Sequence, residues 1–345
     1  MKFNKIILFS FKQNFLTILF TLFLIFLILF SKSNIFAAQN ALTLWAQNVI
    51  PTLFPFFIAT ELLNYTNLPY YLGKLTNKFM KPLFNIPGEG SYAFIMGILS
   101  GYPIGAKIVN NLLENNICTK SEAERMLAFT NNSGPLFIIG TIGITLFNNI
   151  HIGIVLFITH ILSCLTIGLL FGFLSKKHFF KNSQSENRTY SSKTPNISDL
   201  GTIISTSITN SISTILLIGG FIVLFSIIIS IINNLNIITY ISNFLNIPHD
   251  YTNCIIIGLL ELTNGVNAVS LIHTKHLSIQ IIITAFLLGF AGISIFLQIF
   301  SIASKHKLSI KPYLIGKLLQ GCFAALYTYI LIHNFSFLQL DILPI

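Results

Sequence analysis

A short polar break interrupts an apolar stretch of this chain and carries residue types that could bind an anion. The stretch runs from Ala93 to Val109, and its break, Ser100–Lys107, contains two glycines, a proline and a lysine. Backbone groups cannot stay unpaired in lipid, so such a break is tolerated only where it is buried in protein or lines a cavity. A helix that restarts after Pro103 would present unpaired N–H groups and a positive dipole end, which favour an anion.

The lysine of this break would add a full positive charge close to that helix start. The candidate substrate contacts are Ser100, Gly101, Tyr102, Pro103, Gly105 and Lys107. The alternative interpretation is a packing kink in which the Lys107 side chain reaches the membrane interface.

A second break lies in the other half of the chain, at Glu261–Asn267. Glu261 follows the apolar run Ile255–Leu260, and ionisable groups inside a membrane segment are costly and usually functional. We expect Glu261 to bind a coupling cation or a proton; the alternative is a static ion pair with Lys107. The residues of this break expected to contact substrate are Asn264, Gly265 and Asn267. Interrupted segments in corresponding places of two halves point to the binding site of a transporter.

Three consecutive polar residues interrupt the apolar run that follows the first break. They lie within Thr130–Pro135, where Pro135 removes one backbone donor. Asparagine and serine supply both donors and acceptors, so Asn131, Asn132 and Ser133 are candidate substrate contacts. Gln298, inside a later apolar run, is a further candidate. In both places the alternative is hydrogen bonding between helices.

The composition is that of a polytopic membrane protein. Hydrophobic residues make up 53% of the chain, charged residues 9%, and the mean hydropathy is +0.78, whereas soluble domains carry about 25% charged residues. The net charge of +10 comes from short basic flanks, a pattern that places loops in the cytoplasm, so we expect no nucleic-acid partner. The stretches predicted to span the bilayer are Phe15–Phe30, Ala41–Leu63, Ile152–Leu174, Ser213–Ile232, Ile279–Ala303 and Tyr313–Ile332.

Other classes of site have little support in the sequence. The four cysteines are far apart without a CxxC pair, and His273 and His276 have no third ligand nearby, so neither a disulfide framework nor a metal site is indicated. Walker-A, GxSxG and HExxH motifs are missing. We therefore expect no cofactor and no enzymatic reaction, and the energy for transport must come from a gradient or from a separate partner.

A polar, basic linker at residues 176–198 divides the chain into two similar halves. Asn85-Ile86-Pro87 recurs as Asn246-Ile247-Pro248. Each half is predicted to contain a span, a re-entrant hairpin (Gly90–Asn115 or Tyr251–Lys275) and two further spans. Three crossings per half would invert the second half relative to the first. The expected units are a basic flank and first span at 1–38, repeat 1 at 39–175, a cytoplasmic linker at 176–198 and inverted repeat 2 at 199–345; a cleaved signal peptide is the alternative for the first unit.

Four sequence segments together resemble the YlbJ-type sporulation integral membrane proteins. They are Ser100–Lys107, Glu122–Arg125, Phe129–Gly140 and Gly289–Gln298, within a resemblance that covers roughly Asn40 to His333. The resemblance implies an all-α membrane protein with paired nucleoside-recognition (gate) domains, similar in architecture to concentrative nucleoside transporters.

The resemblance also implies a role in endospore formation. It implies a multi-pass protein of the outer forespore membrane that moves dipicolinate, a small organic anion, out of the mother cell. A coupling cation or proton and a homo-oligomer are further expected partners besides the lipid bilayer. The alternatives are a transporter for a nucleoside-like solute and a receptor or scaffold without transport. Paired polar breaks favour transport, because a scaffold has no need to destabilise two spans.

Overall fold

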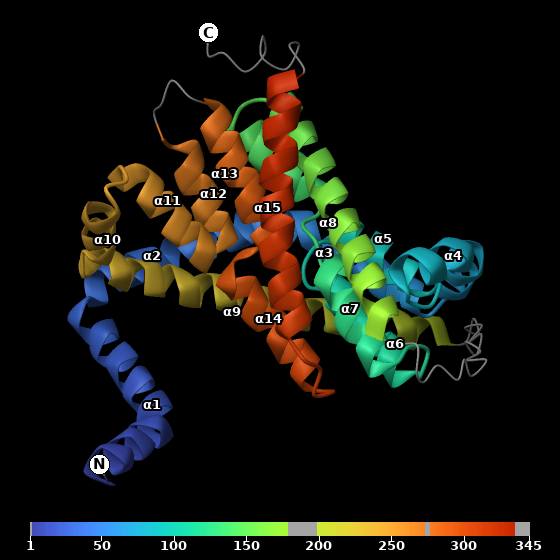
Figure 1. Cartoon of the computed structure of the whole chain (residues 1–345), viewed down its shortest axis with the longest axis horizontal. Helices are drawn as coiled ribbons and strands as arrows, with labels where there is room; N and C mark the ends of the chain where they lie inside the picture. The colour runs from blue at the N-terminus through green and yellow to red at the C-terminus, as the bar shows by residue number, and fades with distance from the viewer. Residues whose placement is uncertain (1, 179–198, 273–276, 335–345) are drawn as a thin grey trace.

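A computed structural model describes residues 2–178, 199–272 and 277–334, and in this part the chain forms helices without strands (Figure 1). Of the predicted linker 176–198, only residues 176–178 are described, and the two histidines at 273 and 276 lie outside the described residues. The helices before the first hairpin are α1 (Lys2–Leu29), α2 (Ser31–Leu44), a π-helix η1 (Trp45–Val49), α3 (Ile50–Asn64) and α4 (Leu68–Phe84).

The predicted first hairpin is present as α5 (Gly90–Ser100) and α6 (Ile104–Glu114). Each has 11 residues and extends only about 16 Å, roughly half the thickness of a hydrocarbon core. The predicted interruption of the next span is also present. It separates α7 (Lys120–Thr130) from the π-helix η2 (Leu136–Leu146), which is followed by the long α8 (Ile150–His178).

The second half begins with the 35-residue α9 (Leu200–Asn234) and the short α10 (Ile237–Leu245). The second predicted hairpin consists of α11 (His249–Leu260) and α12 (Leu262–Ser270), with Glu261 between them. The remaining helices are α13 (Leu277–Phe290), α14 (Gly292–Ser304) and α15 (Lys311–Asn334).

The predicted span Ile279–Ala303 corresponds to the segment Leu277–Ser304, which is long and apolar enough to cross a membrane but is not one continuous helix. This segment is divided into α13 and α14 by two residues with positive φ, Ala291 (74°) and Gly292 (84°). A left-handed residue cannot continue a right-handed helix, so the helix ends there and restarts. The second half therefore has a broken helix after its hairpin, as the first half has in α7 and η2.

The order of elements is the same in both halves. Each has a long helix, a short amphipathic helix, a hairpin, a broken helix and a final long helix. The amphipathic helices α4 and α10 both end at an asparagine in the left-handed conformation, Asn85 (φ 54°) and Asn246 (φ 53°), each followed by Ile-Pro. In Figure 1 the final helices α8 and α15 run in opposite directions. This is the arrangement an inverted repeat requires, and inverted insertion in the membrane stays a prediction.

Five helical segments of the described chain are long and apolar enough to cross a membrane. They are Ser31–Asn64, Ile150–Ser175, Leu200–Asn234, Leu277–Ser304 and Lys311–Asn334, while the predicted first span corresponds to the shorter apolar helix Asn14–Leu29. Helices α8, α13 and α15 pack against one another, and α9 runs along α2 and α3, across the direction of α8 and α15 (Figure 1). The indole Nε1 of Trp45, in η1 between α2 and α3, donates to the Ile215 carbonyl of α9 at 3.0 Å and joins α9 to this segment.

Candidate substrate-binding site

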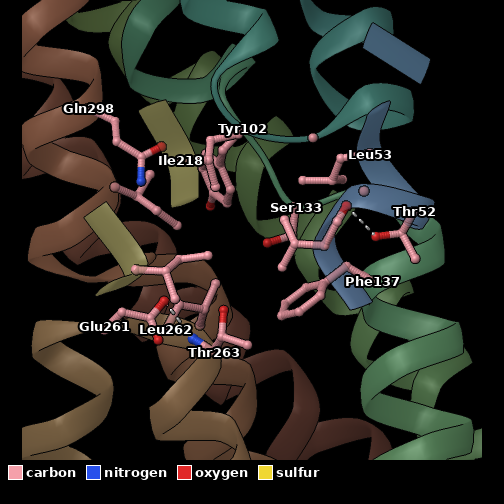
Figure 2. Close-up of a pocket in the computed structure, with 15 residues that line it drawn as sticks. Thr52, Leu53, Tyr102, Ser133, Phe137, Ile218, Glu261, Leu262, Thr263 and Gln298 are labelled. Carbon is pink, nitrogen blue, oxygen red and sulfur yellow. Dashed lines mark hydrogen bonds between the residues drawn. The ribbon is translucent and has the colours of Figure 1, made fainter. Parts of the chain in front are cut away.

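Three interruptions of helical structure meet at one cavity (Figure 2). The tip of the first hairpin contributes Gly101 and Tyr102, the α7–η2 break contributes Ser133 and Gly134, and the second hairpin contributes Glu261. Side chains of α3, α9 and α14 complete the wall. Segments far apart in the sequence thus supply polar backbone to one cavity, as expected for irregular backbone at membrane depth.

The tip of the first hairpin turns through a glycine that no other residue could replace without strain. Gly101 has φ 79°, and its carbonyl accepts from the N–H of Ile104 at 3.1 Å, where α6 begins without a side-chain cap. The neighbouring Ser100 hydroxyl is not in the cavity wall but lies 2.7 Å from that of Thr60 on α3. Pro103 is buried at the start of α6.

Gly105 explains how closely the first hairpin approaches α7. A Cβ atom at this position would overlap the carbonyl oxygen of Thr130. Gly105 is therefore required for the contact between α6 and the end of α7, and it does not line the cavity. The hairpin and the α7–η2 break are held together by backbone packing.

The α7–η2 break buries a run of polar groups. Asn131, Asn132 and Ser133 are each at most 2% exposed. The Ser133 hydroxyl interacts with Tyr102 and the Asn131 side chain with Tyr313, although neither contact has the geometry of a normal hydrogen bond. Buried polar groups normally pair with protein, ordered water or ligand, so this break is a place where a polar solute could bind. Asn132 instead donates to the Phe129 carbonyl at 2.7 Å and shapes the break.

The second hairpin places a carboxylate at its tip. Glu261 is 2% exposed, and its two oxygens accept from the backbone N–H groups of Thr263 (3.1 Å) and Asn264 (2.7 Å). The carboxylate therefore caps the start of α12, where negative charge is favoured by the helix dipole. The Asn264 amide donates to Ser226 Oγ of α9 at 2.8 Å, and a Cβ atom at Gly265 would overlap Gly258 of α11. Neither these two residues nor the half-buried Asn267 lines the cavity.

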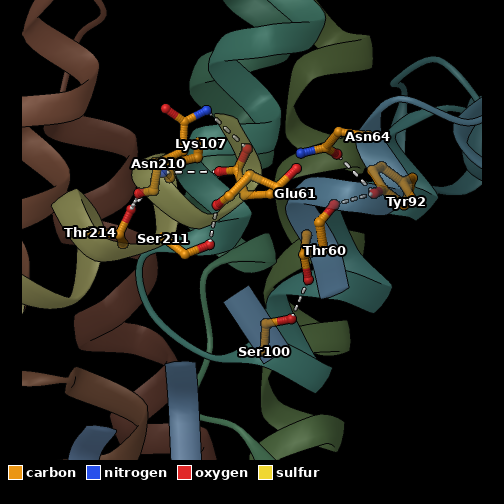
Figure 3. A network of polar contacts seen from close by, with 10 residues as sticks. Thr60, Glu61, Asn64, Tyr92, Ser100, Lys107, Asn210, Ser211 and Thr214 are labelled. Atoms are coloured by element: carbon orange, nitrogen blue, oxygen red, sulfur yellow. Dashed lines mark hydrogen bonds and ion pairs between the residues drawn. The ribbon is translucent and has the colours of Figure 1, made fainter. Parts of the chain in front are cut away.

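The ion pair between Glu261 and Lys107, which the sequence left open, is not formed. Lys107 Nζ instead lies 3.1 Å from Glu61 Oε1 and 2.6 Å from Thr214 Oγ1 (Figure 3). Asn210 of α9 also donates to Glu61. This network joins the first hairpin to α3 and α9, outside the cavity wall. The Lys107 ammonium is therefore paired with the Glu61 carboxylate. A role of Lys107 in substrate binding stays a prediction.

Gln298 on α14 lines the cavity and is 2% exposed. Of the candidate residues, the cavity thus brings together Gly101, Tyr102, Ser133, Glu261 and Gln298. Sequence reasoning missed a buried lysine of α15, Lys317, which is 1% exposed and lies behind this wall. The signal was available, because Lys317 falls inside the predicted span Tyr313–Ile332, where a charged residue is functional by default.

Comparison with known proteins agrees with a membrane protein. The sequence profile of the family described as "Gate: Nucleoside recognition" matches residues 46–217. The chain is similar to the sporulation integral membrane protein YlbJ of Bacillus subtilis (strain 168), with 33% identity over 317 residues. The match covers 86% of this chain and 76% of that protein. No solved structure matches the chain.

Proposed function

Because the chain belongs to the YlbJ family of sporulation integral membrane proteins, we propose that it is a membrane transporter for a small organic anion, dipicolinate, during endospore formation. The observation that carries this proposal is the single cavity shared by two hairpin tips and the α7–η2 break. Transporters place substrate sites where discontinuous helices from two repeats meet near the midplane. The cavity wall combines apolar side chains with a few polar groups, as small-molecule sites do.

Helix starts supply the proposed attraction for an anion. Both α6 and η2 begin at the cavity wall without a side-chain cap. Their first N–H groups lack helical partners and carry the positive end of the helix dipole. Gly101 and Gly134 lie against each other there, because a Cβ atom at either position would contact the backbone of the other; their small size therefore brings the two helix starts close together. Tyr102 offers an aromatic face to the pyridine ring, and Gln298 of α14 offers an amide.

Glu261 is the proposed coupling residue. A bare carboxylate in the cavity wall would repel a dicarboxylate, so a proton or cation taken up at Glu261 would make anion entry easier. Transport coupled to a gradient then needs no ATPase motif. We place the transporter in the outer forespore membrane, where it would carry dipicolinate out of the mother cell.

Flux measurement tests the proposal directly. Purified protein in vesicles should accelerate uptake of labelled dipicolinate, with unlabelled dipicolinate competing and nucleosides failing to compete. Ser133→Phe should fill the cavity and abolish flux, whereas Ser301→Phe, on an exposed position of α14, should leave it intact. Uptake of nucleosides alone would assign a nucleoside-like solute, and absence of flux for either solute would favour a receptor or scaffold.

A further inference from the structure

Lys317 is a lysine enclosed by neutral groups inside the helix bundle. Its side chain belongs to α15 and is 1% exposed. The ammonium Nζ lies 2.7 Å from Gln320 Oε1 and 3.4 Å from Asn132 Oδ1, and Gln320 also donates to Asn132 at 3.1 Å. The rings of Tyr102 and Tyr313 lie 5.3 Å and 6.0 Å from Nζ. Amide oxygens can accept from an ammonium and aromatic faces can lie against one, but none of these groups carries a negative charge.

No carboxylate neutralises this ammonium in the described part of the chain. Lys107 pairs there with Glu61, and the carboxylates of Asp250 and Glu114 lie beside His249 and His306. A buried charge without an opposite charge is strongly unfavourable. The contrast with Lys107 is direct, because that lysine has Glu61 within 3.1 Å.

The missing negative charge could enter through the cavity. Tyr102 and Ser133 line the cavity, and the Lys317 ammonium lies against the Tyr102 ring behind that wall. Asn132, which accepts from Lys317, directly precedes Ser133 in the chain. One layer of side chains therefore separates the ammonium from a bound solute.

We propose that Lys317 is the specificity-determining charge of the cavity, holding an anion by attraction through the Tyr102 layer. This inference rests on the proposed function and names the residue that selects for negative charge. Lys317 need not touch the substrate. Its Nζ lies 5.3 Å from the centre of the Tyr102 ring, and a ligand in contact with the other face of that ring would lie about 3.5 Å beyond it. The distance between the ammonium and the ligand charge would then be about 9 Å. At an effective dielectric constant of about 20, this attraction corresponds to roughly 20-fold in affinity per unit charge.

The test pairs a charge change in the protein with a charge change in the ligand. Dipicolinate and its uncharged diamide should be titrated into wild-type, Lys317→Met and Lys311→Met protein. Lys311 is an exposed lysine of the same helix, so its replacement removes an equal charge far from the cavity. We expect Lys317→Met to weaken dipicolinate binding at least about tenfold and to leave diamide binding unchanged. Lys311→Met should change neither.

Folding should not obscure this result, because replacing a buried charge by an apolar side chain of similar volume is often neutral or stabilising. Lys317→Gln provides a second neutral variant that keeps hydrogen bonding to the amides. Equal loss of dipicolinate and diamide binding would mean that Lys317 only shapes the cavity, and it would overturn the proposal. Unchanged dipicolinate binding in a folded variant would overturn it as well.

A thermal-shift panel of small aromatic carboxylates separates this inference from the proposed substrate. If wild-type protein ignores dipicolinate but is stabilised by another carboxylate, and Lys317→Met is not, the role of Lys317 stands and the dipicolinate assignment fails. If dipicolinate binds equally to both proteins, the substrate stands and Lys317 is excluded. If no carboxylate stabilises the wild type, both proposals fail.

Discussion

The two hairpins have similar lengths and the same place in the order of elements, yet their tips differ in charge. The first hairpin has a neutral tip, an uncapped start of α6, and a lysine already paired with Glu61. The second has Glu261 at its tip, capping α12 with its own carboxylate. One side of the cavity therefore has helix starts without a side-chain cap, while the other carries a carboxylate. Two similar structural units can thus give a cavity with a positive and a negative side, which is useful for an ion that must bind and then leave.

The first test of this comparison asks whether α4 and α10 lie on opposite sides of the membrane. It has the largest expected effect, because each position is labelled either from one side or from the other. In a protein whose four cysteines have been replaced, Lys78→Cys on α4 and Asn243→Cys on α10 should react with a membrane-impermeant thiol reagent from opposite sides. Both positions are exposed on the two equivalent amphipathic helices. The basic residues of α4 predict that Lys78 faces the cytoplasm. Labelling of both from one side would refute the inverted repeat.

A methyl group at Gly105 should cause the largest loss of stability. Gly105→Ala would push a Cβ atom into the Thr130 carbonyl, where backbone cannot move aside as a side chain can. We expect a loss of about 3 kcal/mol in the free energy of unfolding, measured by denaturant titration in detergent. Gly220→Ala is the matched control, since nothing lies within 4 Å of that position. Equal stability of both variants would show that the first hairpin is not held by this contact.

Replacement of Lys107 should affect stability more than binding. Lys107→Gln removes the ion pair with Glu61 and the hydrogen bond to Thr214, which should cost about 2 kcal/mol. Adding Glu61→Gln should recover most of the loss, because it removes the unpaired charge. The sequence-based expectation makes a different forecast. If Lys107 contacts substrate, dipicolinate affinity should fall tenfold or more while stability stays unchanged.

Removal of the Glu261 cap should have the smallest effect on stability. Glu261→Ala frees two backbone N–H groups at the start of α12 and should cost about 1 kcal/mol. Glu261→Gln keeps one acceptor oxygen and should remain folded while flux loses its dependence on pH or cations. Glu122→Ala is the control, because Glu122 accepts from the Thr119 N–H at the start of α7, far from the cavity. A Glu261→Gln variant with unaltered coupling would restrict Glu261 to its capping role.

The sequence predicted those helix interruptions at which polar residues, glycine or proline occur in an apolar stretch. Glycine, proline or asparagine in an apolar run identified both hairpins and the α7–η2 break. The break at Ala291 was missed because Phe290, Ala291 and Gly292 are all compatible with a buried helix, and only the left-handed backbone ends it. The partner of Lys107 was missed for another reason. Glu61 is 46 residues away in the chain, and its pairing depends on how three helices pack.

A structure determined with saturating dipicolinate is the most direct test of the central claim. The account predicts ligand density in the cavity between Tyr102, Ser133 and Gln298, with a carboxylate facing the start of α6 or η2. The Lys107–Glu61 ion pair should remain intact beside it. Density at Lys107 with the ion pair broken, or an empty cavity at a concentration that supports flux, would contradict the account.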